Sequence, residues 1–413
     1  MRVGVVGLGY AGLPLAIAFA EEGHHVVAVD VDARKVQALQ AGRSYIEDIS
    51  SERVAAVRDR IEASTQPGRL ATVNAIIICV PTPLTPNREP DLGPVMAAGA
   101  AVSAVLQPGQ LVVLESTTYP GTTRERLAPL LEESGLAAGR DFHLAYSPER
   151  VDPGRTDYTL RNTPKVVGGL TDACLDRVVA LYCEICDDIV QVSSPDVAEL
   201  TKLLESTFRL VNITLVNELA VLCDRMGIDI WEVVDTASTK PYGFMRFDPG
   251  PGTGGHCMPV DPFYLSWRAR EFDMSTRFID LAADINQQMP YHCVSKVERA
   301  LNDAGKPVNG SKVALFGVAY KSNVSDIRES PALKMIALLR ALGADVVYHD
   351  PHVASIPHHD IAGSSFSDSL DGADCAVIVT AHKDVAHDEV AQRVPVLVDL
   401  RGTTRRRAVQ QQR

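Results

Sequence analysis

The chain has 413 residues, of which 46% are hydrophobic, and this length predicts two or three domains with a large buried core. Its formal net charge of −12 argues against nucleic acid as a partner, and no apolar run suggests a membrane span or a secretory signal. The eight cysteines are not spaced as a disulfide framework, so we expect a soluble, cytoplasmic protein.

The first 195 residues alternate between short apolar strands and helical patterns. A strand at residues 2–7 leads into a glycine turn and an alanine-rich helix that runs to about Glu22. Later strands are expected at His25–Asp30, Ala75–Val80, Leu111–Glu115 and Phe142–Tyr146, with an edge strand near Val166. This alternation predicts a doubly wound parallel sheet with helices on both faces.

The pattern changes to helices from about Pro195 to Gln288. Residues 196–226 contain no glycine or proline, which predicts one long helix. Strands resume at Lys312–Gly317, Asp345–His349, Cys375–Thr380 and Val396–Asp399. We therefore expect an α/β protein with two Rossmann-like domains, at 1–195 and 296–413, joined by a central helical segment at 196–295.

The turn after the first strand reads Gly7-Leu8-Gly9-Tyr10-Ala11-Gly12, a GxGxxG that opens a helix. Such a turn lets a pyrophosphate approach the backbone at a helix N-terminus. Asp30 ends the second strand, 18 residues beyond Gly12, where a carboxylate can bind the adenosine ribose hydroxyls. Asp30 should repel a 2′-phosphate, so we expect NAD to be favoured over NADP, although the nearby Arg34 weakens this distinction.

The segment from Pro249 to Asp261 is rich in glycine and proline, which predicts a shaped loop unsuited to a helix or strand. We expect Gly254 and Gly255 to present backbone amides beside His256 and Cys257, an environment that suits a reactive thiolate. Asp261 is placed to orient a water or a lysine. The alternative interpretation is a buried structural cysteine in a turn.

On the predicted long helix, Glu199, Lys202, Ser206 and Arg209 share one face. Such a stripe is either a solvated surface or a site in which the lysine acts as an acid, a base or an oxyanion donor. The Cys183–Cys186 pair, a bare CxxC in a helical pattern, is interpreted as core. No ligand spacing suggests a metal site.

Together these motifs resemble the UDP-glucose/GDP-mannose dehydrogenase family over essentially the whole chain. The motifs that carry the resemblance are Gly7–Gly12, Cys79-Val80-Pro81-Thr82-Pro83, Glu115-Ser116-Thr117, Ser147-Pro148-Glu149-Arg150, the Lys202 helix, the Cys257 loop, Gly317-Val318-Ala319-Tyr320-Lys321 and Asp326-Ile327-Arg328-Glu329-Ser330. The resemblance implies that two NAD⁺ oxidise the C6 hydroxyl of a nucleotide sugar to a carboxylate.

The resemblance also implies roles for individual residues. Cys257 corresponds to the thiol that attacks the intermediate aldehyde, Lys202 to the acid/base or oxyanion lysine, and Asp261 to its water-orienting carboxylate. Glu149 corresponds to the carboxylate of thioester hydrolysis, and Thr117 to a cofactor and water contact. The implied NAD contacts are Gly7, Gly9, Tyr10, Ala11, Gly12, Asp30, Arg34, Thr82, Thr117 and Arg328. The implied UDP-sugar contacts are Glu149, Arg150, Val151, Lys202, Ser206, Arg209, Gly254, Tyr320, Lys321 and Arg401.

Ser206 departs from the family pattern, which usually has an asparagine there. The runs at 229–234, 240–245 and 249–252 look most like the UDP-N-acetylglucosamine 6-dehydrogenases, with UDP-N-acetylmannosamine and UDP-glucose as alternative substrates. A two-electron dehydrogenase, an NAD-using epimerase and a catalytically silent nucleotide-binding protein are rival interpretations. The family resemblance and the long apolar helix both predict a homodimer or a higher homo-oligomer.

Overall fold

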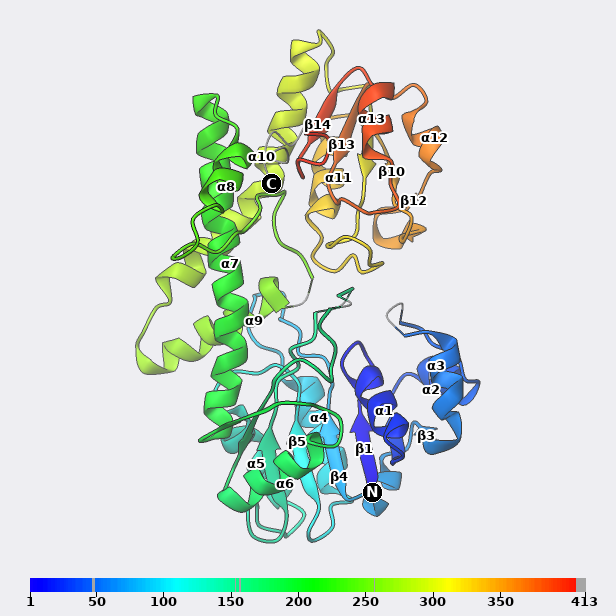
Figure 1. Cartoon of the computed structure of the whole chain (residues 1–413), viewed down its shortest axis with the longest axis vertical. Helices are drawn as coiled ribbons and strands as arrows, with labels where there is room; N and C mark the ends of the chain where they lie inside the picture. The colour runs from blue at the N-terminus through cyan, green and yellow to red at the C-terminus, as the bar shows by residue number, and fades with distance from the viewer. Residues whose placement is uncertain (47–48, 153, 156, 256, 406–413) are drawn as a thin grey trace. The chain divides into compact units, whose positions relative to one another are not determined.

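The computed structural model describes residues 1–46, 49–152, 154–155, 157–255 and 257–405 (Figure 1). The chain forms two compact units, which are described separately. The first unit contains residues 1–206 and 260–275, and the second contains residues 207–259 and 276–413. Two helices pass from one unit to the other, because these divisions fall inside α7 and α9.

The first unit is built on an eight-stranded sheet with the order β3-β2-β1-β4-β5-β6-β7-β8. Neighbouring strands are parallel except for the antiparallel pair β6 and β7. The strands are β1 (Arg2–Val6), β2 (His25–Val29), β3 (Ile61–Ser64), β4 (Ala75–Ile78), β5 (Leu111–Leu114), β6 (His143–Tyr146), β7 (Lys165–Gly169) and β8 (Ile189–Val192). The direction of strand order reverses between β1 and β4, and dinucleotides bind at such a switch point.

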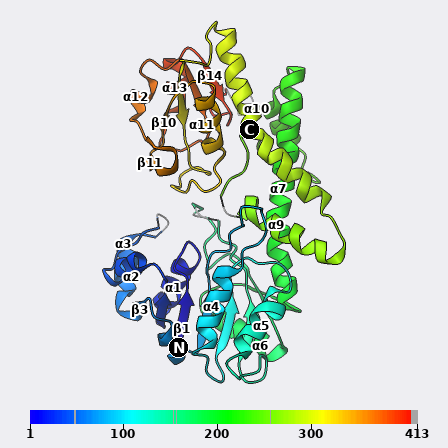
Figure 2. The same ribbon diagram turned by 180° about the vertical axis from the view of Figure 1, so that it is seen from behind.

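Helices cover both faces of this sheet (Figures 1 and 2). One apolar core lies between the sheet and α1 (Gly12–Glu21), α2 (Ala33–Gln40), α3 (Ser51–Val57) and α6 (Asp172–Tyr182). A second core lies on the other face, against α4 (Gly93–Ser103) and α5 (Ala128–Glu132). Because both faces are buried, the central strands are continuously apolar, as in the Ala-Ile-Ile-Ile run of β4.

The central helices are α7 (Pro195–Met226), α8 (Ile230–Ala237), α9 (Cys257–Ala269) and α10 (Arg277–Asp303). The predicted long helix is therefore confirmed. In length and composition alone α7 could cross a membrane, which corrects the expectation that no apolar run is that long, but the core helix of a soluble protein passes the same test. Helix α10 continues through residue 295, where a domain boundary is expected from the sequence.

The second unit contains a parallel four-stranded sheet with the order β10-β9-β13-β14. Its strands are β9 (Lys312–Phe316), β10 (Asp345–His349), β13 (Cys375–Ile378) and β14 (Leu397–Asp399), and β11 (Ser355–Ile356) pairs with β12 (Ile361–Ala362). The helices α11 (Pro331–Ala341), α12 (Phe366–Leu370) and α13 (His387–Arg393) complete this unit.

The turn after the first strand has the same form in both sheets. The amide of Gly7 donates to Val29 O at 2.8 Å, and the amide of Gly317 donates to His349 O at 2.9 Å. Both glycines have positive φ, +92° and +81°, which an L side chain rarely adopts. The expected α/β fold with two Rossmann-like sheets and a long central helix is confirmed.

Two details of the sequence-based expectation are corrected. The strand near Val166 is not at an edge, because β7 pairs with β6 on one side and β8 on the other. The edge strands β3 and β8 were not expected, because their sequences, Ile-Glu-Ala-Ser and Ile-Val-Gln-Val, are short and partly polar. Such runs become strands through their neighbours in the sheet, and their own sequence signal is weak.

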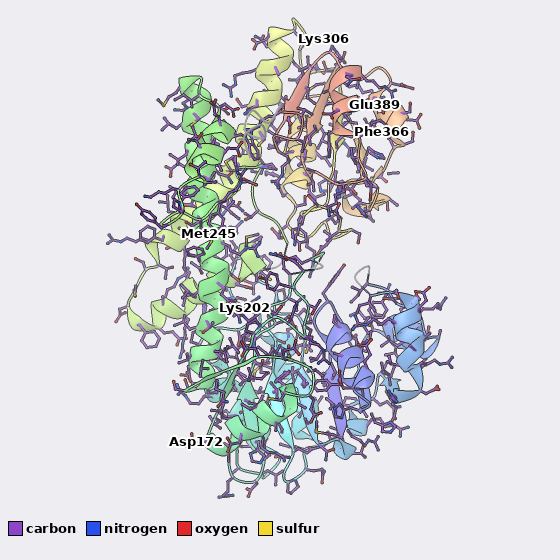
Figure 3. The ribbon with its side chains drawn as sticks, in the orientation of Figure 1. Asp172, Lys202, Met245, Lys306, Phe366 and Glu389 are labelled. Atoms are coloured by element: carbon purple, nitrogen blue, oxygen red, sulfur yellow. The ribbon has the colours of Figure 1, made fainter. Side chains whose placement is uncertain are left out.

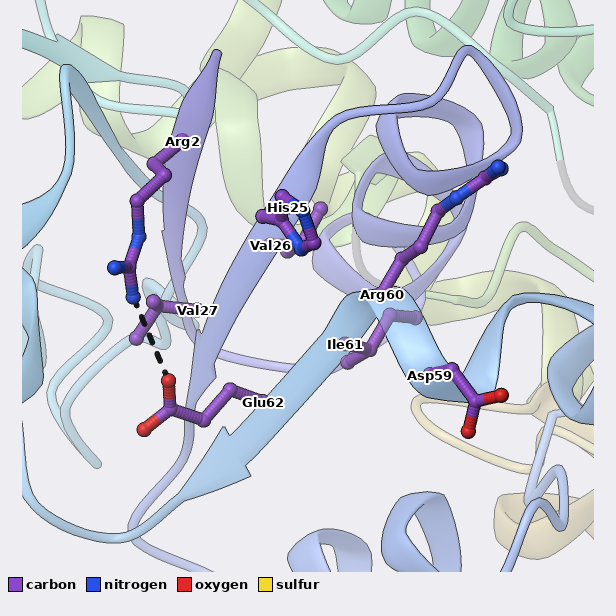
Figure 4. A pocket seen from close by; sticks show the side chains of 8 residues that line it. All are labelled: Arg2, His25, Val26, Val27, Asp59, Arg60, Ile61 and Glu62. Carbon is purple, nitrogen blue, oxygen red and sulfur yellow. Dashed lines mark ion pairs between the residues drawn. The ribbon is translucent and has the colours of Figure 1, made fainter.

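A shallow pocket of about 300 Å³ lies at the amino ends of β1, β2 and β3 (Figure 4). Its charged lining includes Arg2 and Glu62, whose side chains approach to 3.6 Å, together with Asp59 and Arg60. Ligands of open α/β sheets bind at the opposite, carboxyl ends of the strands. We therefore place the candidate site at the carboxyl ends.

Candidate active site

The glycine turn between β1 and α1 has the geometry that a dinucleotide requires. A Cβ atom on Gly12 would lie 1.8 Å from Gly7 O, and one on Gly7 would lie 2.7 Å from Cys79 O, so both positions exclude a side chain. A Cβ on Gly9 would meet nothing within 4 Å. The turn is thus crowded at Gly7 and Gly12 and open at Gly9, where a pyrophosphate can approach the backbone.

Asp30 follows β2 and is buried beside this turn. Its Oδ2 accepts the amide of Leu8 at 2.7 Å, and the ammonium group of Lys35 donates to the same oxygen at 3.1 Å. Asp30 is therefore in the place that ribose recognition requires, and the residues of the turn fit an NAD. Arg34 is highly exposed and pairs with Asp32 at 2.8 Å, so Lys35 is the basic side chain that reaches Asp30.

The other expected cofactor residues fall into two groups. Tyr10 and Ala11 belong to the turn itself, while Thr82 and Thr117 follow β4 and β5 at the same carboxyl edge of the sheet, Thr82 being buried. Arg328 lies in the second unit, where its guanidinium pairs with Asp326 at 2.6 Å. The structure thus gathers the expected cofactor residues of the first unit at one edge of its sheet, and Arg328 belongs to the second unit.

Lys202 and Ser206 lie one turn apart on α7 and face Asp261 of α9 (Figure 3 shows Lys202). The hydroxyl of Ser206 donates to Asp261 Oδ2 at 2.7 Å, whereas Asp261 Oδ1 has no hydrogen-bond partner among the described residues. Burial raises the pKa of Asp261 to about 6, although the positive charge of Lys202 and the Ser206 hydrogen bond oppose this. A buried carboxylate with one vacant acceptor suits the binding of a water or a polar substrate group.

Glu199 shares the Lys202 face of α7 but has a different partner. Its carboxylate accepts the amides of Gly121 at 2.6 Å and Thr123 at 2.8 Å, and also the Thr123 hydroxyl. Burial raises its pKa to about 7, against the lowering effect of these hydrogen bonds. Glu199 therefore attaches α7 to the loop after β5. The polar face predicted from the sequence thus has two parts, because Glu199 is structural whereas Lys202 and Ser206 face Asp261.

Glu149 and Arg150 follow β6 and are both partly buried. Glu149 Oε1 accepts the amide of Val151 at 2.5 Å. Arg150, expected at the substrate, instead donates to Glu205 and to Pro164 O, each at 2.6 Å. In this structure its guanidinium thus ties the segment after β6 to α7 and to the segment before β7.

Cys257 is exposed and is the first residue of α9, with Asp261 one turn further along the same helix. This corrects the expectation that the whole of 249–261 is a loop. Pro259 lies in the first turn, where a helix needs no amide donor, so it is compatible with the helix. A helix N-terminus favours a thiolate through the positive end of its dipole. His256, expected beside the thiol, lies outside the described residues.

The glycine loop before α9 packs within the second unit. The amide of Gly255 donates to Arg328 O at 2.8 Å, so the expectation that it is presented to a ligand is wrong for this structure. A Cβ on Gly254 would lie 2.8 Å from the Cβ of Tyr320, and one on Gly250 would lie 2.4 Å from a guanidinium nitrogen of Arg401. The structure therefore brings Gly254, Tyr320 and Arg401 to one loop.

Lys321 follows Tyr320 and is partly buried, while Arg209 is exposed on α7.

Cys183 is exposed and Cys186 is buried, with its thiol 3.4 Å from Leu160 O. Within the described residues, no group of three His, Cys, Asp or Glu side chains is arranged to hold a metal ion.

Two charged residues were missed by the sequence reasoning. Lys35 reaches Asp30, and its only sequence signal is its position five residues after Asp30. Lys165 is buried and forms an ion pair with Glu115. A lone lysine at the start of an apolar strand is an unusual position for a charge, and this could have identified Lys165.

Comparison with known proteins shows the same organisation over the full length. The UDP-glucose/GDP-mannose dehydrogenase family matches through its NAD-binding domain at residues 1–186, its central domain at 196–288 and its UDP-binding domain at 314–406. A UDP-N-acetyl-D-mannosamine dehydrogenase of Pyrococcus horikoshii is 36% identical, over 93% of this chain and 90% of that protein. A UDP-N-acetyl-D-glucosamine 6-dehydrogenase of Pseudomonas aeruginosa is 37% identical, over 86% of this chain and 84% of that protein.

A solved structure of the UDP-D-ManNAc dehydrogenase from Pyrococcus horikoshii superimposes with a TM-score of 0.90 at 34% identity, covering 98% of this chain and 96% of that one. The glycine turn with the buried Asp30 beside it, the two Rossmann-like sheets and these matches agree. The chain therefore belongs to the UDP-glucose/GDP-mannose dehydrogenase family, and it is an NAD-dependent oxidoreductase that acts on a UDP-sugar.

Proposed function

We propose that the protein oxidises the C6 hydroxyl of UDP-N-acetylglucosamine to a carboxylate in two steps, with Cys257 as a covalent nucleophile. Bound NAD⁺ supplies the hydride acceptor for each oxidation. We assign residues 1–195 to cofactor binding, 296–413 to the UDP moiety and 196–295 to catalysis and subunit contacts. The observation that carries the proposal is the position of Cys257 at the N-terminus of α9, one turn before the buried Asp261.

Side chains of the protein carry the proton transfer and the covalent step of the two oxidations. In the first oxidation, the Asp261 carboxylate takes up the hydroxyl proton as the C6 hydride leaves to bound NAD⁺, while the Lys202 ammonium group holds the hydroxyl oxygen. The Cys257 thiolate then adds to the aldehyde carbon, and loss of the second C6 hydride converts the thiohemiacetal to a thioester. Lys202 supplies a donor for the developing oxyanion, a contribution worth roughly 10² to 10³ in rate. The Ser206 hydroxyl holds Asp261 through its hydrogen bond to Oδ2.

Hydrolysis completes the reaction. A water adds to the thioester carbonyl, the C–S bond breaks, and the Cys257 thiolate is regenerated. Glu149 accepts the proton of the water, and the unpartnered Oδ1 of Asp261 offers a second acceptor for orienting it. Because the aldehyde stays bound to Cys257, it is not released between the two oxidations.

The choice of sugar is supported by the likeness of residues 229–234, 240–245 and 249–252 to the UDP-N-acetylglucosamine 6-dehydrogenases, and by Ser206. Ser206 is smaller than the asparagine that is usual in the family, which leaves room for an acetamido substituent. Arg150 gives less support, because its donors are used by Glu205 and Pro164 in this structure. A site built to bind a polar substituent disfavours a substrate that lacks it, because its polar groups then stay unpaired.

A single assay tests the reaction and the substrate together. We expect purified protein to release two NADH per uronic acid formed from UDP-N-acetylglucosamine, with a kcat/KM about tenfold or more above that for UDP-glucose. UDP-N-acetylmannosamine is the closest competitor and belongs in the same panel. One NADH per sugar would contradict the four-electron reaction. A preference for UDP-glucose or UDP-N-acetylmannosamine would overturn the choice of sugar and leave the chemistry intact.

We further propose that two copies associate through α7 and α10. On α7 the side chains of Phe208, Leu215, Leu219, Leu222 and Met226 are each at least 41% exposed. Their spacing of seven, four, three and four residues forms one apolar stripe of the kind that pairs with another helix. Phe278, Leu281 and Tyr291 extend the exposed apolar surface on α10. Sedimentation should give a mass of at least two chains, and a monomer at assay concentration would refute the proposal.

A further inference from the structure

A buried lysine in the first unit contacts the segment that carries Glu149. Lys165 is the first residue of β7, and its side chain is 3% exposed. Its ammonium group forms an ion pair with Glu115, donates to Pro148 O at 3.3 Å and lies 3.8 Å from Glu149 Oε2. Lys165 thus holds two consecutive residues, Pro148 and Glu149, at the end of β6.

The charge of Lys165 is compensated within the same interior. Glu115 is fully buried, and its second oxygen accepts the hydroxyl of Tyr182 at 2.5 Å. Burial lowers the pKa of Lys165, but the carboxylates of Glu115 and Glu149 outweigh this, so the pKa is raised overall and the amine stays protonated. Glu115 therefore supplies the nearer anion that a buried cation requires, and Glu149 adds a second, more distant one.

A second contact crosses between the same two chain segments. Arg150, the residue after Glu149, donates to the carbonyl of Pro164, the residue before Lys165, at 2.6 Å. Lys165 in turn donates to the carbonyl of Pro148, the residue before Glu149. The segments after β6 and before β7 are therefore joined by reciprocal side-chain to backbone hydrogen bonds on either side of Glu149.

The two carboxylate oxygens of Glu149 have different neighbours. Oε1 accepts the Val151 amide at 2.5 Å, which fixes the carboxylate to its own loop. Oε2 lies 3.8 Å from the Lys165 ammonium, which is beyond hydrogen-bond length but close enough for electrostatic attraction. Oε2 is thus drawn toward a fixed cation while no hydrogen bond from Lys165 occupies its lone pairs.

We propose that Lys165 is a positioning residue for thioester hydrolysis, holding Glu149 where its free oxygen can accept the proton of the attacking water. This inference rests on the proposed function, which makes Glu149 the hydrolytic group. In the step concerned, a water oxygen bonds to the thioester carbon, its proton passes to Glu149, and the C–S bond breaks to release the Cys257 thiolate. Lys165 itself contacts neither the substrate nor the cofactor in this step.

The test replaces the lysine with a side chain of similar length and no charge. Lys165→Met removes both contacts with the Glu149 segment but leaves Glu115 buried without its cation. The double variant Lys165→Met/Glu115→Gln removes both charges and retains an acceptor for the Tyr182 hydroxyl. If the single variant does not fold, the double variant provides a protein without Lys165 in which hydrolysis can be measured. Tyr182→Phe is the matched control, because it removes a hydrogen bond to Glu115 and leaves both contacts of Lys165 with the Glu149 segment intact.

Rapid mixing with UDP-N-acetylglucosamine and NAD⁺ separates oxidation from hydrolysis. In the lysine variants we expect a rapid burst of two NADH per active site, a steady state roughly 10- to 100-fold slower than in the wild type, and a thioester on Cys257 detectable by mass spectrometry of the quenched protein. Tyr182→Phe should show wild-type hydrolysis and no accumulated adduct. A purely structural defect would instead slow both oxidations and give no burst.

The outcomes distinguish this inference from the proposed function. Wild-type hydrolysis in folded lysine variants, or loss of the burst with slower oxidation, would overturn the role of Lys165. Accumulation of the adduct in Tyr182→Phe to the same extent would also overturn it. Slow hydrolysis would then follow from any disturbance of the buried group formed by Lys165, Glu115 and Tyr182, and not from loss of the lysine contacts with the Glu149 segment. If Cys257→Ala still forms the uronic acid, the covalent mechanism itself fails, whatever the lysine variants do.

Discussion

Replacing Cys257 with alanine is expected to abolish formation of the uronic acid, lowering the rate by on the order of 10⁴-fold or more. The variant has no thiolate to hold the aldehyde, so the second oxidation loses its covalent intermediate. Because Cys257 is exposed at the N-terminus of α9, the substitution removes no buried packing and should leave the fold intact. The measurement is the yield of uronic acid, with NADH counted in parallel.

Cys257→Ser provides the matched comparison for this prediction. A serine hydroxyl is much harder to ionise than a thiol, and its ester hydrolyses more slowly than a thioester. We expect this variant to stall after the first oxidation or to accumulate an ester on residue 257 that mass spectrometry can detect. Near-normal acid production by the alanine variant would eliminate the covalent mechanism.

Replacing Asp261 with asparagine is expected to lower kcat by about 10²-fold or more, because an amide cannot accept a proton and does not balance the charge of Lys202. The neutral side chain retains an oxygen that can accept the Ser206 hydrogen bond seen at 2.7 Å. Initial rates at saturating UDP-sugar and NAD⁺ measure the effect. An unchanged kcat would show that Asp261 has no part in the chemistry.

The same substitution should make the protein more stable at neutral and alkaline pH. Burial raises the pKa of Asp261 from its usual 3.8 to about 6 in the folded state, so folding favours the protonated form. The stabilising contribution of the acid is fully present below pH 3.8 and is lost as the pH rises through 6. At pH 8 the buried charge costs up to about 3 kcal/mol, which the asparagine variant avoids.

Thermal unfolding of the wild type and Asp261→Asn across pH 4 to 8 measures this difference. The gain in melting temperature should be small at pH 4, increase up to about pH 7 and then remain constant. Ser206→Ala is the opposing control, because it removes a hydrogen bond that favours the ionised form and should lower stability at pH 8. A lower stability of Asp261→Asn than of the wild type at pH 8 would contradict this prediction. It would show that the folded protein stabilises the Asp261 carboxylate through groups other than Lys202 and Ser206.

The features that could be predicted from the sequence depend on local chemistry. The Gly7–Gly12 turn and Asp30 are recognisable because a pyrophosphate needs a backbone without side chains and a ribose needs a carboxylate at the end of the next strand. The sequence pattern predicts the ends of most strands to within two residues, because buried parallel strands are continuous apolar runs. Residues 196–226 indicated a helix because they lack glycine and proline.

The tertiary structure decided which polar side chains meet. Glu199 and Lys202 share one face of α7, yet Glu199 accepts hydrogen bonds from Gly121 and Thr123 while Lys202 acts on Asp261. The Ser206 to Asp261 contact joins residues 55 positions apart, and the Lys165 to Glu115 ion pair joins residues 50 apart. Helical periodicity gives the direction of a side chain but not its neighbour, because the neighbour comes from another segment that packs there only in the folded chain.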